Sequence, residues 1–126
     1  MDIKYVEIKN LRLESLSGQT GNAKRKEWNC PVKLHAIAEI NDKISNKFNE
    51  QFQLYCTIYK NNKITDDVEF IHGNKGCKNP CRMRQISGNS DSEIVFTFEI
   101  NKPGDYIVGI GNRKEFPEKY VKFRVE

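Results

Sequence analysis

Histidine is scarce in this chain, and long apolar runs are missing. Only His35 and His72 occur among 126 residues, and neither sits in a recognisable nucleophile or metal motif, so a hydrolytic triad has no support. No stretch of the sequence approaches the roughly 18 apolar residues that a membrane span needs, and the N-terminal residues lack the apolar core of a signal peptide. We therefore expect a non-enzymatic protein that does not enter a membrane.

An export signal is not visible either, since the chain opens on the strand-like pattern MDIKYVEIKN. We expect a cytoplasmic protein on this ground; the alternative is a secreted, mature domain whose signal has been removed. Hydrophobic residues make up 37% and charged residues 30% of the sequence, values typical of a folded globular chain. Residues 1–126 are expected to form one domain.

The charge balance has only a small positive excess. Lys and Arg number 21 and Asp and Glu number 17, which gives a net charge of +4. Solubility alone accounts for an excess of this size. An argument for an anionic partner therefore depends on where the cations cluster along the chain.

Apolar and polar residues alternate with period two through most of the sequence, which is typical of strands with one buried face. The pattern indicates about seven strands, over residues 6–13, 31–40, 51–60, 64–71, 93–100, 106–110 and 121–125. A step at Asn10 indicates a bulge. A tight-turn signal at residues 60–63 makes the fourth strand the hairpin partner of the third. The expected fold class is all-β, a two-sheet antiparallel sandwich without helices.

The residues expected to face the core are apolar and occupy alternate positions of their strands. They are Val6, Ile8, Leu11, Leu13, Val32, Leu34, Ala36, Ala38, Ile40, Phe52, Leu54, Cys56, Ile58, Ile94, Phe96, Phe98, Ile100, Tyr106, Val108, Ile110, Val121, Phe123 and Val125.

The segment INKPGDYIVGIG, residues 100–111, carries a Pro-Gly-X-Tyr-X-Val step around Tyr106. Together with the strand count, this step resembles immunoglobulin-like and fibronectin-type-III-like domains. The resemblance covers the whole chain in strand pattern and only these few residues in motif, and it implies an immunoglobulin-like sandwich. The chain departs from antibody domains because the Tyr106 strand has no cysteine and the single tryptophan, Trp28, precedes the second strand. Such a fold leaves the function open.

Four cysteines occur, and their positions decide how each is interpreted. Cys56 lies on the inward face of residues 51–60, which predicts a buried free thiol. Cys77 and Cys81 are separated by three residues within HGNKGCKNPCRMR, residues 72–84. That spacing suits a short disulfide loop in an oxidising compartment.

Two other interpretations of the Cys77 and Cys81 pair stay open, namely reduced surface thiols and a zinc site with His72. A structural zinc needs four ligands, so Cys30 or His35 would have to complete the set. Cys30, however, begins a strand at the far end of the expected sandwich. We therefore expect no cofactor, with zinc at His72, Cys77 and Cys81 as the alternative.

Three long connections, residues 41–50, 72–91 and 111–118, should gather at one end of the sandwich because the strand direction alternates. Loops at one end of a rigid sandwich are a usual place for recognition. The residues expected to contact a partner there are Lys75, Lys78, Arg82, Arg84, Arg113 and Phe116. A cationic surface of this kind suits an acidic protein patch, an anionic ligand or nucleic acid, although scattered lysines are also common on solvated surfaces.

A second candidate surface lies in the connection between the first two strands, at the opposite end. It holds the basic triplet Lys24, Arg25 and Lys26 beside Trp28. A tryptophan next to cations can stack on a base while the cations contact phosphate. The simpler interpretation is that Trp28 caps the end of the sandwich.

Two glycines, Gly109 and Gly111, leave the outward face of the penultimate strand bare. Such a face lets another backbone or a ligand approach closely, or it marks a bulge. A nucleotide-binding loop is not indicated, because the strand-then-helix setting of such a loop is missing.

These patterns favour a protein-interaction module that holds its partner through basic loops or a sheet edge; pairing at an edge would also produce a homodimer. Binding of nucleic acid or a nucleotide is the first alternative. The second is a carbohydrate-binding sandwich that uses Tyr55, Tyr59 or Trp28 as a stacking platform.

Overall fold

A computed structural model describes residues 3–4, 7–16, 21–40, 51–52, 54–71, 77–82 and 93–126 of the chain. The predicted core positions Val6 and Phe52 have no described side chain. The strands are β1 (Ile3–Lys4), β2 (Ile8–Ser15), β3 (Gly21–Asn22), β4 (Glu27–Trp28), β5 (Val32–Ile40), β6 (Gln51–Phe52), β7 (Tyr55–Lys60), β8 (Lys63–Ile64), β9 (Val68–Phe70), β10 (Cys81–Arg82), β11 (Glu93–Ile100), β12 (Gly104–Gly111) and β13 (Lys119–Val125). No helix occurs among the described residues.

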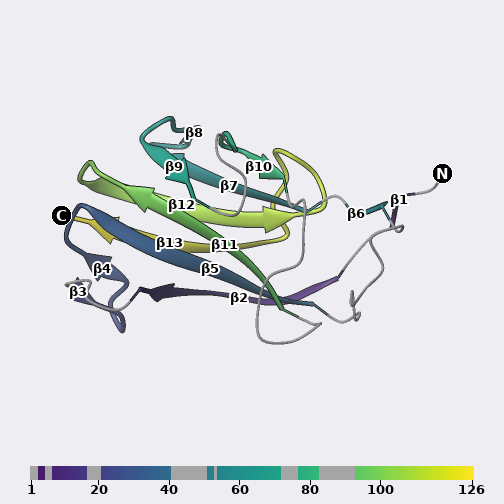
Figure 1. Cartoon of the computed structure of the whole chain (residues 1–126), viewed down its shortest axis with the longest axis horizontal. Coiled ribbons are helices and arrows are strands. Elements are labelled where there is room, and N and C mark those ends of the chain that lie inside the picture. The colour runs from purple at the N-terminus through teal and green to yellow at the C-terminus, as the bar shows by residue number, and fades with distance from the viewer. Residues whose placement is uncertain are drawn as a thin grey trace.

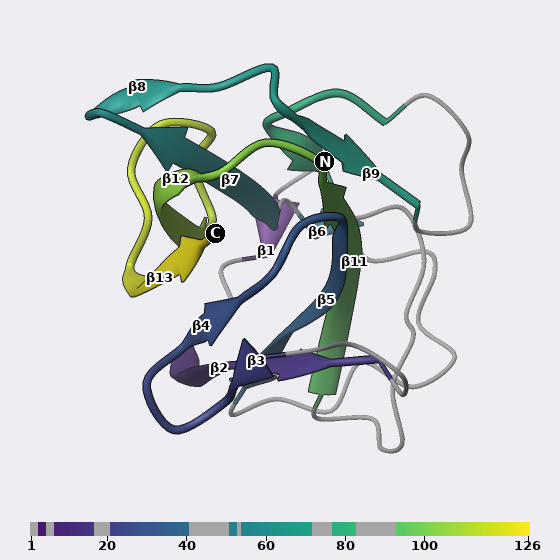
Figure 2. The same cartoon turned by 90° about the vertical axis from the view of Figure 1, so that its left-hand side faces the viewer.

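The strands form two sheets that face each other, so the all-β sandwich is confirmed. One sheet has the order β2-β5-β11-β9, and the other has the order β10-β7-β12-β13-β4-β3 with β8 also paired to β7. Figure 2 shows the two layers along their strands. The short β1 and β6 pair with each other in parallel, outside both sheets.

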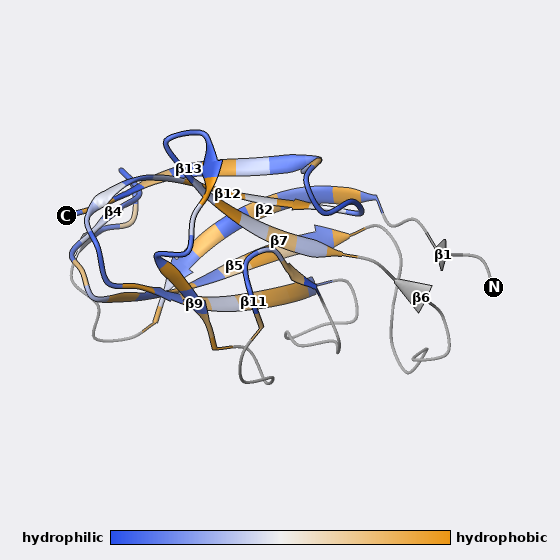
Figure 3. Ribbon diagram, turned by 90° about the horizontal axis from the view of Figure 1, so that it is seen from above, coloured by the Kyte–Doolittle hydropathy of each residue, from blue (hydrophilic) through white to orange (hydrophobic). Residues whose placement is uncertain are grey.

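Alternate residues of the long strands fill the space between the sheets, as the period-two pattern predicts. In β11, Ile94, Phe96, Phe98 and Ile100 are at most 1% exposed, while the residues between them are half-buried. In Figure 3 apolar and polar residues alternate along the strands of both sheets. Burial of these rows in a dry layer is the main favourable term of the fold.

Aromatic side chains concentrate at one end of this layer. Phe123 stacks on Tyr106 with ring centroids 5.5 Å apart, and Phe98 and Trp28 lie 6.0 Å and 6.4 Å from Phe123. Phe70 adds a further ring, 5.9 Å from Phe98. The hydroxyl of the buried Tyr106 donates to the carbonyl of Lys102 at 2.7 Å, which satisfies its polar group without water.

Two local sequence signals are confirmed. The pairing of β2 with β5 shifts register between Ile8 and Asn10, which is the predicted bulge. Asn61 and Asn62 have φ values of 55° and 63°, the left-handed conformations that asparagine tolerates in a two-residue hairpin turn between β7 and β8.

The prediction of one hairpin strand over residues 64–71 is wrong. β8 ends at Ile64, and the chain then changes sheets, so that β9 pairs with β11 instead of β7. The crossing places the buried Phe70 on the inner side of the four-stranded sheet. Residues 51–60 are likewise two elements, because β6 pairs with β1 and only β7 belongs to the large sheet.

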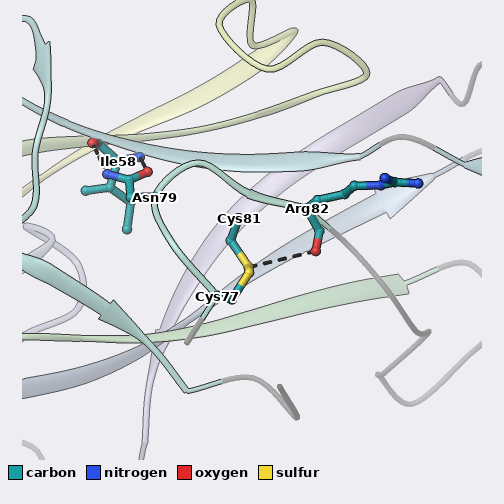
Figure 4. The surroundings of a disulfide bond; sticks show 5 residues. All are labelled: Ile58, Cys77, Asn79, Cys81 and Arg82. Carbon is teal, nitrogen blue, oxygen red and sulfur yellow. Dashed lines mark hydrogen bonds between the residues drawn. A yellow bond between two sulfur atoms is a disulfide. The ribbon is translucent and has the colours of Figure 1, made fainter. Parts of the chain in front are cut away.

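The side chain of Asn79 lies along the edge of β7, just past the point where β8 stops pairing with it. Its side-chain oxygen accepts from the N–H of Ile58 at 2.9 Å, and its side-chain nitrogen donates to the carbonyls of Ile58 and Thr65, both at 2.7 Å. Figure 4 shows the amide facing Ile58. The side chain therefore provides the hydrogen bonds that a neighbouring strand would otherwise have made, and it ties the 77–82 segment to β7.

Replacing Asn79 with alanine should lower the free energy of unfolding by about 2–3 kcal/mol, because the N–H of Ile58 and the carbonyl of Thr65 would lose their side-chain partner, while the carbonyl of Ile58 keeps the N–H of Thr65. Urea denaturation measures this change. Asn101→Ala is the matched control, since Asn101 is exposed, and its effect should stay within about 0.5 kcal/mol. Equal effects of the two substitutions would contradict the role assigned to Asn79.

Candidate functional site

The segment around Cys77 and Cys81 is held on the rim of the large sheet. The two cysteines form a disulfide, Cys81 is buried against the core, and Arg82 beside it is exposed. Figure 4 shows Arg82 pointing away from the disulfide. Of the other residues predicted to bind a partner here, Lys78 is exposed, whereas Lys75 and Arg84 lie outside the described residues, as does His72 of the zinc alternative.

The loop after β12 carries the other two residues predicted at this end. Arg113 and Phe116 form an isolated bridge, and the Phe116 side chain is 69% exposed. Arg82 pairs with Tyr55, which in turn pairs with Gly111 at the end of β12. Arg82, Arg113 and Phe116 therefore lie at the same end of the large sheet, and Figure 1 shows β10 beside the loop that leaves β12.

The bare face at Gly109 and Gly111 is covered by the chain itself. A Cβ added at Gly109 would lie 2.6 Å from Cβ of Pro117, and one at Gly111 would lie 2.6 Å from the carbonyl oxygen of Phe116. The N–H of Glu118 donates to the carbonyl of Ile110 at 2.9 Å, which fixes the loop in this position. The close approach that the glycines permit is thus made by residues 116–118.

A groove of about 460 Å³ lies at the opposite end, on the outward face of the large sheet. Its walls come from the turn before β4, the turn after β7, and the outward residues of β12 and β13. The residues that give it chemical character are Arg25, Lys26, Tyr59, Ile107, Lys122 and Arg124. The groove combines part of the predicted second surface with residues from distant strands.

The β4 pairing brings two residues of the basic triplet, Arg25 and Lys26, to this groove. The N–H groups of Lys24 and Arg25 donate to the side-chain oxygen of Asn22, and Lys26 takes the left-handed φ of 55°. The N–H of Arg124 then donates to the carbonyl of Lys26 at 2.8 Å, so the turn is fastened to the edge of β13. Lys26 thereby comes beside the outward cations of the last strand.

The floor of the groove is a row across three strands. Ile107 of β12 pairs with Tyr59 of β7 on one side and with Lys122 of β13 on the other. Directly opposite residues on one face lie close enough for their side chains to touch. A half-buried ring and an aliphatic side chain therefore lie next to an exposed cation.

Several cations near the groove and on the opposite sheet have acidic partners among the described residues. Lys60 and Lys102 both contact Asp67, at 3.0 Å and 3.2 Å. Arg12 contacts Glu14, Glu39 and Glu93 at 3.0–3.2 Å. Arg124 has two longer contacts, 3.9 Å to Asp105 and 3.4 Å to Glu126.

Three cations of the groove differ from these. Arg25, Lys26 and Lys122 form no ion pair with any described residue. Glu27 and Asp105 also line the groove, so its charge is mixed with a positive excess. An unpaired cation in a concave surface is available to an anionic group of a ligand, because no internal partner has to be displaced.

Trp28 does not offer the stacking surface that the sequence allowed. Its side chain is 2% exposed and packs edge-on against Phe123. The indole belongs to the core at the end of the sandwich, as the simpler interpretation held. Lys24, Arg25 and Lys26 remain exposed beside it.

The ligands considered for zinc are not assembled in the described part of the chain. No group of three or more His, Cys, Asp or Glu side chains gathers there. The N–H of Cys30 donates to the carbonyl of Glu126, and Nδ1 of His35 lies 2.8 Å from Oγ1 of Thr97. The sulfurs of Cys77 and Cys81 are bonded to each other.

Comparisons of this chain with models of protein families, with curated proteins and with solved structures found no match. Within the residues that the structure describes, there is no helix of the length and apolar character needed to cross a membrane.

The contact of Asp67 with two lysines should make stability depend on acid pH. The hydrogen bond from Lys60, followed by the one from Lys102, lowers the pKa of Asp67 against the opposing effect of burial. A carboxyl group with a lowered folded-state pKa stabilises the fold fully above its ordinary pKa of about 4. That stabilisation is lost as the pH falls through the lowered value.

Thermal unfolding at pH 2–7 tests this. Asp67→Asn should melt below the wild type at neutral pH, and the difference should shrink towards pH 2. Asp66→Asn is the control, since Asp66 is exposed, and it should follow the wild type throughout. If the melting temperatures of Asp67→Asn and the wild type differed by the same amount at every pH, the carboxylate charge would contribute nothing to stability.

Proposed function

We propose that this chain is an immunoglobulin-like sandwich that acts as a non-enzymatic protein-interaction module. Its groove holds an acidic segment of a partner protein. The observation that carries the proposal is a groove in which Arg25, Lys26 and Lys122, three cations without an ion pair among the described residues, lie beside Tyr59 and Ile107.

Two features support the immunoglobulin-like assignment. The order β2-β5-β11-β9 opposite β7-β12-β13 corresponds to the four-and-three strand arrangement of constant-type immunoglobulin domains. The bond from the Tyr106 hydroxyl to the carbonyl of Lys102 corresponds to the tyrosine corner of such domains, in which a tyrosine near the start of the penultimate strand bonds the backbone a few residues upstream.

A protein partner fits the groove better than nucleic acid does. Glu27 and Asp105 in the lining would repel a continuous phosphate backbone, whereas they can pair with occasional cations of a peptide. Tyr59 and Ile107 favour apolar side chains between acidic ones. Because Trp28 is buried, the base-stacking platform considered for nucleic acid and for carbohydrate is reduced to partly exposed tyrosines.

Charge reversal in the groove tests the proposal. The double variant Lys26→Glu, Lys122→Glu should bind a fluorescent peptide of alternating glutamate and leucine at least about 10-fold more weakly than the wild type, because two attractive contacts become repulsive. Fluorescence polarisation measures the dissociation constants. The matched control is Lys9→Glu, Lys119→Glu, which makes the same change in net charge at exposed residues outside the groove lining.

Two results would contradict the proposal. Equal weakening by both double variants would indicate attraction to net charge alone. Tighter binding of a single-stranded oligonucleotide, with an affinity that falls steeply as salt is added, would favour the nucleic-acid alternative. A third variant, Lys78→Glu with Arg82→Glu, asks whether the partner instead uses the disulfide end, where these two residues are exposed.

A further inference from the structure

A third cysteine lies beside the Cys77–Cys81 disulfide. Cys56 in β7 is directly opposite Cys81 in β10, and the two residues are 0% and 2% exposed. Opposite residues of an antiparallel pair have Cβ atoms about 4.5–5.5 Å apart, a separation close to what a disulfide spans. Since both side chains are buried on the core side of the sheet, the Cys56 thiol neighbours the Cys81 sulfur.

We propose that Cys56 and the Cys77–Cys81 disulfide form an intramolecular thiol–disulfide exchange site. The Cys56 sulfur, as thiolate, attacks the sulfur of Cys81. A Cys56–Cys81 bond forms, the Cys77–Cys81 bond breaks, and Cys77 leaves as a thiolate. Cys56 loses one proton to solvent before the attack and Cys77 takes up one proton afterwards, so the proton count does not change. One thiol and one disulfide are present before and after, so no external oxidant or reductant takes part.

The core holds the site in its resting form. Burial raises the pKa of the Cys56 thiol, so the attacking thiolate is scarce while β10 stays paired. The element that has to open is short, because β10 has two residues. The residues just before β10 are tied to β7 by the side chain of Asn79. Local opening of such an element needs much less free energy than global unfolding.

The exchanged form has two favourable features. Its cross-link closes a much longer segment of chain than the four-residue separation of Cys77 and Cys81, and a longer closed loop restricts the unfolded chain more. The released Cys77 is half-buried and precedes the exposed Lys78, a cationic neighbour that favours a thiolate. Exchange would thus place a reactive thiol next to Lys78, at the end opposite the groove.

Disulfide mapping tests the proposal on the intact protein. The protein is held at pH 8.5 without added thiol and labelled with N-ethylmaleimide. It is then denatured at pH 6.5 with isotope-labelled N-ethylmaleimide, which blocks the buried thiols, digested with trypsin and analysed by mass spectrometry. The resting form gives peptide 76–78 linked to peptide 79–82, and the exchanged form gives peptide 48–60 linked to peptide 79–82. We expect the second linked pair to appear with time, together with N-ethylmaleimide on Cys77.

Variants separate this exchange from other thiol chemistry. Cys56→Ala should keep Cys77 unlabelled, whereas Cys30→Ala, which removes the other free thiol, should behave as the wild type. Asn79→Ala should accelerate the exchange, and it tests the same step if Cys56→Ala fails to fold. The proposal would be overturned if neither the wild type nor Asn79→Ala gave the 48–60 to 79–82 link. Labelling of Cys77 that depends on Cys30 would also overturn it.

Discussion

The packed layer between the two sheets determines where everything else can lie. Leu34, Phe96 and Phe98 from one sheet and Ile58 and Val108 from the other are at most 1% exposed. Because side chains alternate across each strand, burying these residues turns their neighbours outward. The outward positions then include Tyr59, Ile107 and Lys122, which make the floor of the groove. The candidate binding surface is thus a consequence of the core.

The same constraint explains why much of the fold could be predicted from the sequence. A register slip of one residue would expose every apolar residue of a strand, so the alternation in 31–40 and 93–100 identifies β5 and β11 with nearly correct bounds. The Asn61–Asn62 turn was predictable because its conformation depends on those two residues alone. Local sequence patterns were enough to predict those elements whose conformation depends on neighbouring residues in the chain.

The parts that could not be predicted depend on contacts between distant residues. No pattern within residues 64–71 indicates that the chain changes sheets after Ile64. The edge of β7 beyond β8 is occupied by the side chain of Asn79, which comes from a later part of the chain. Likewise, the parallel pairing of Trp28 with Val125 joins segments far apart in the chain. Without that pairing, Arg25 and Lys26 have no visible relation to Lys122. The alternating cations Lys122 and Arg124 were the one signal that could have indicated a basic stripe on the last strand.

The two ends of the sandwich have different chemistry. The groove end offers unpaired cations and an apolar floor, which suits reversible association with an acidic segment. The other end carries a disulfide, a buried thiol and the exposed Phe116, and Cys56 and Cys81 are packed in the core there. A partner bound in the groove would leave the cysteines at the opposite end accessible to their own chemistry.

Whether an acidic segment binds in the groove is tested most directly by amide chemical shifts. Isotope-labelled protein would be titrated with the glutamate–leucine peptide while amide resonances are followed. If the peptide binds in the groove, the largest shifts should fall on the groove residues Lys26, Tyr59, Ile107 and Lys122. Shifts that gather instead on Arg82, Arg113 and Phe116 would contradict it.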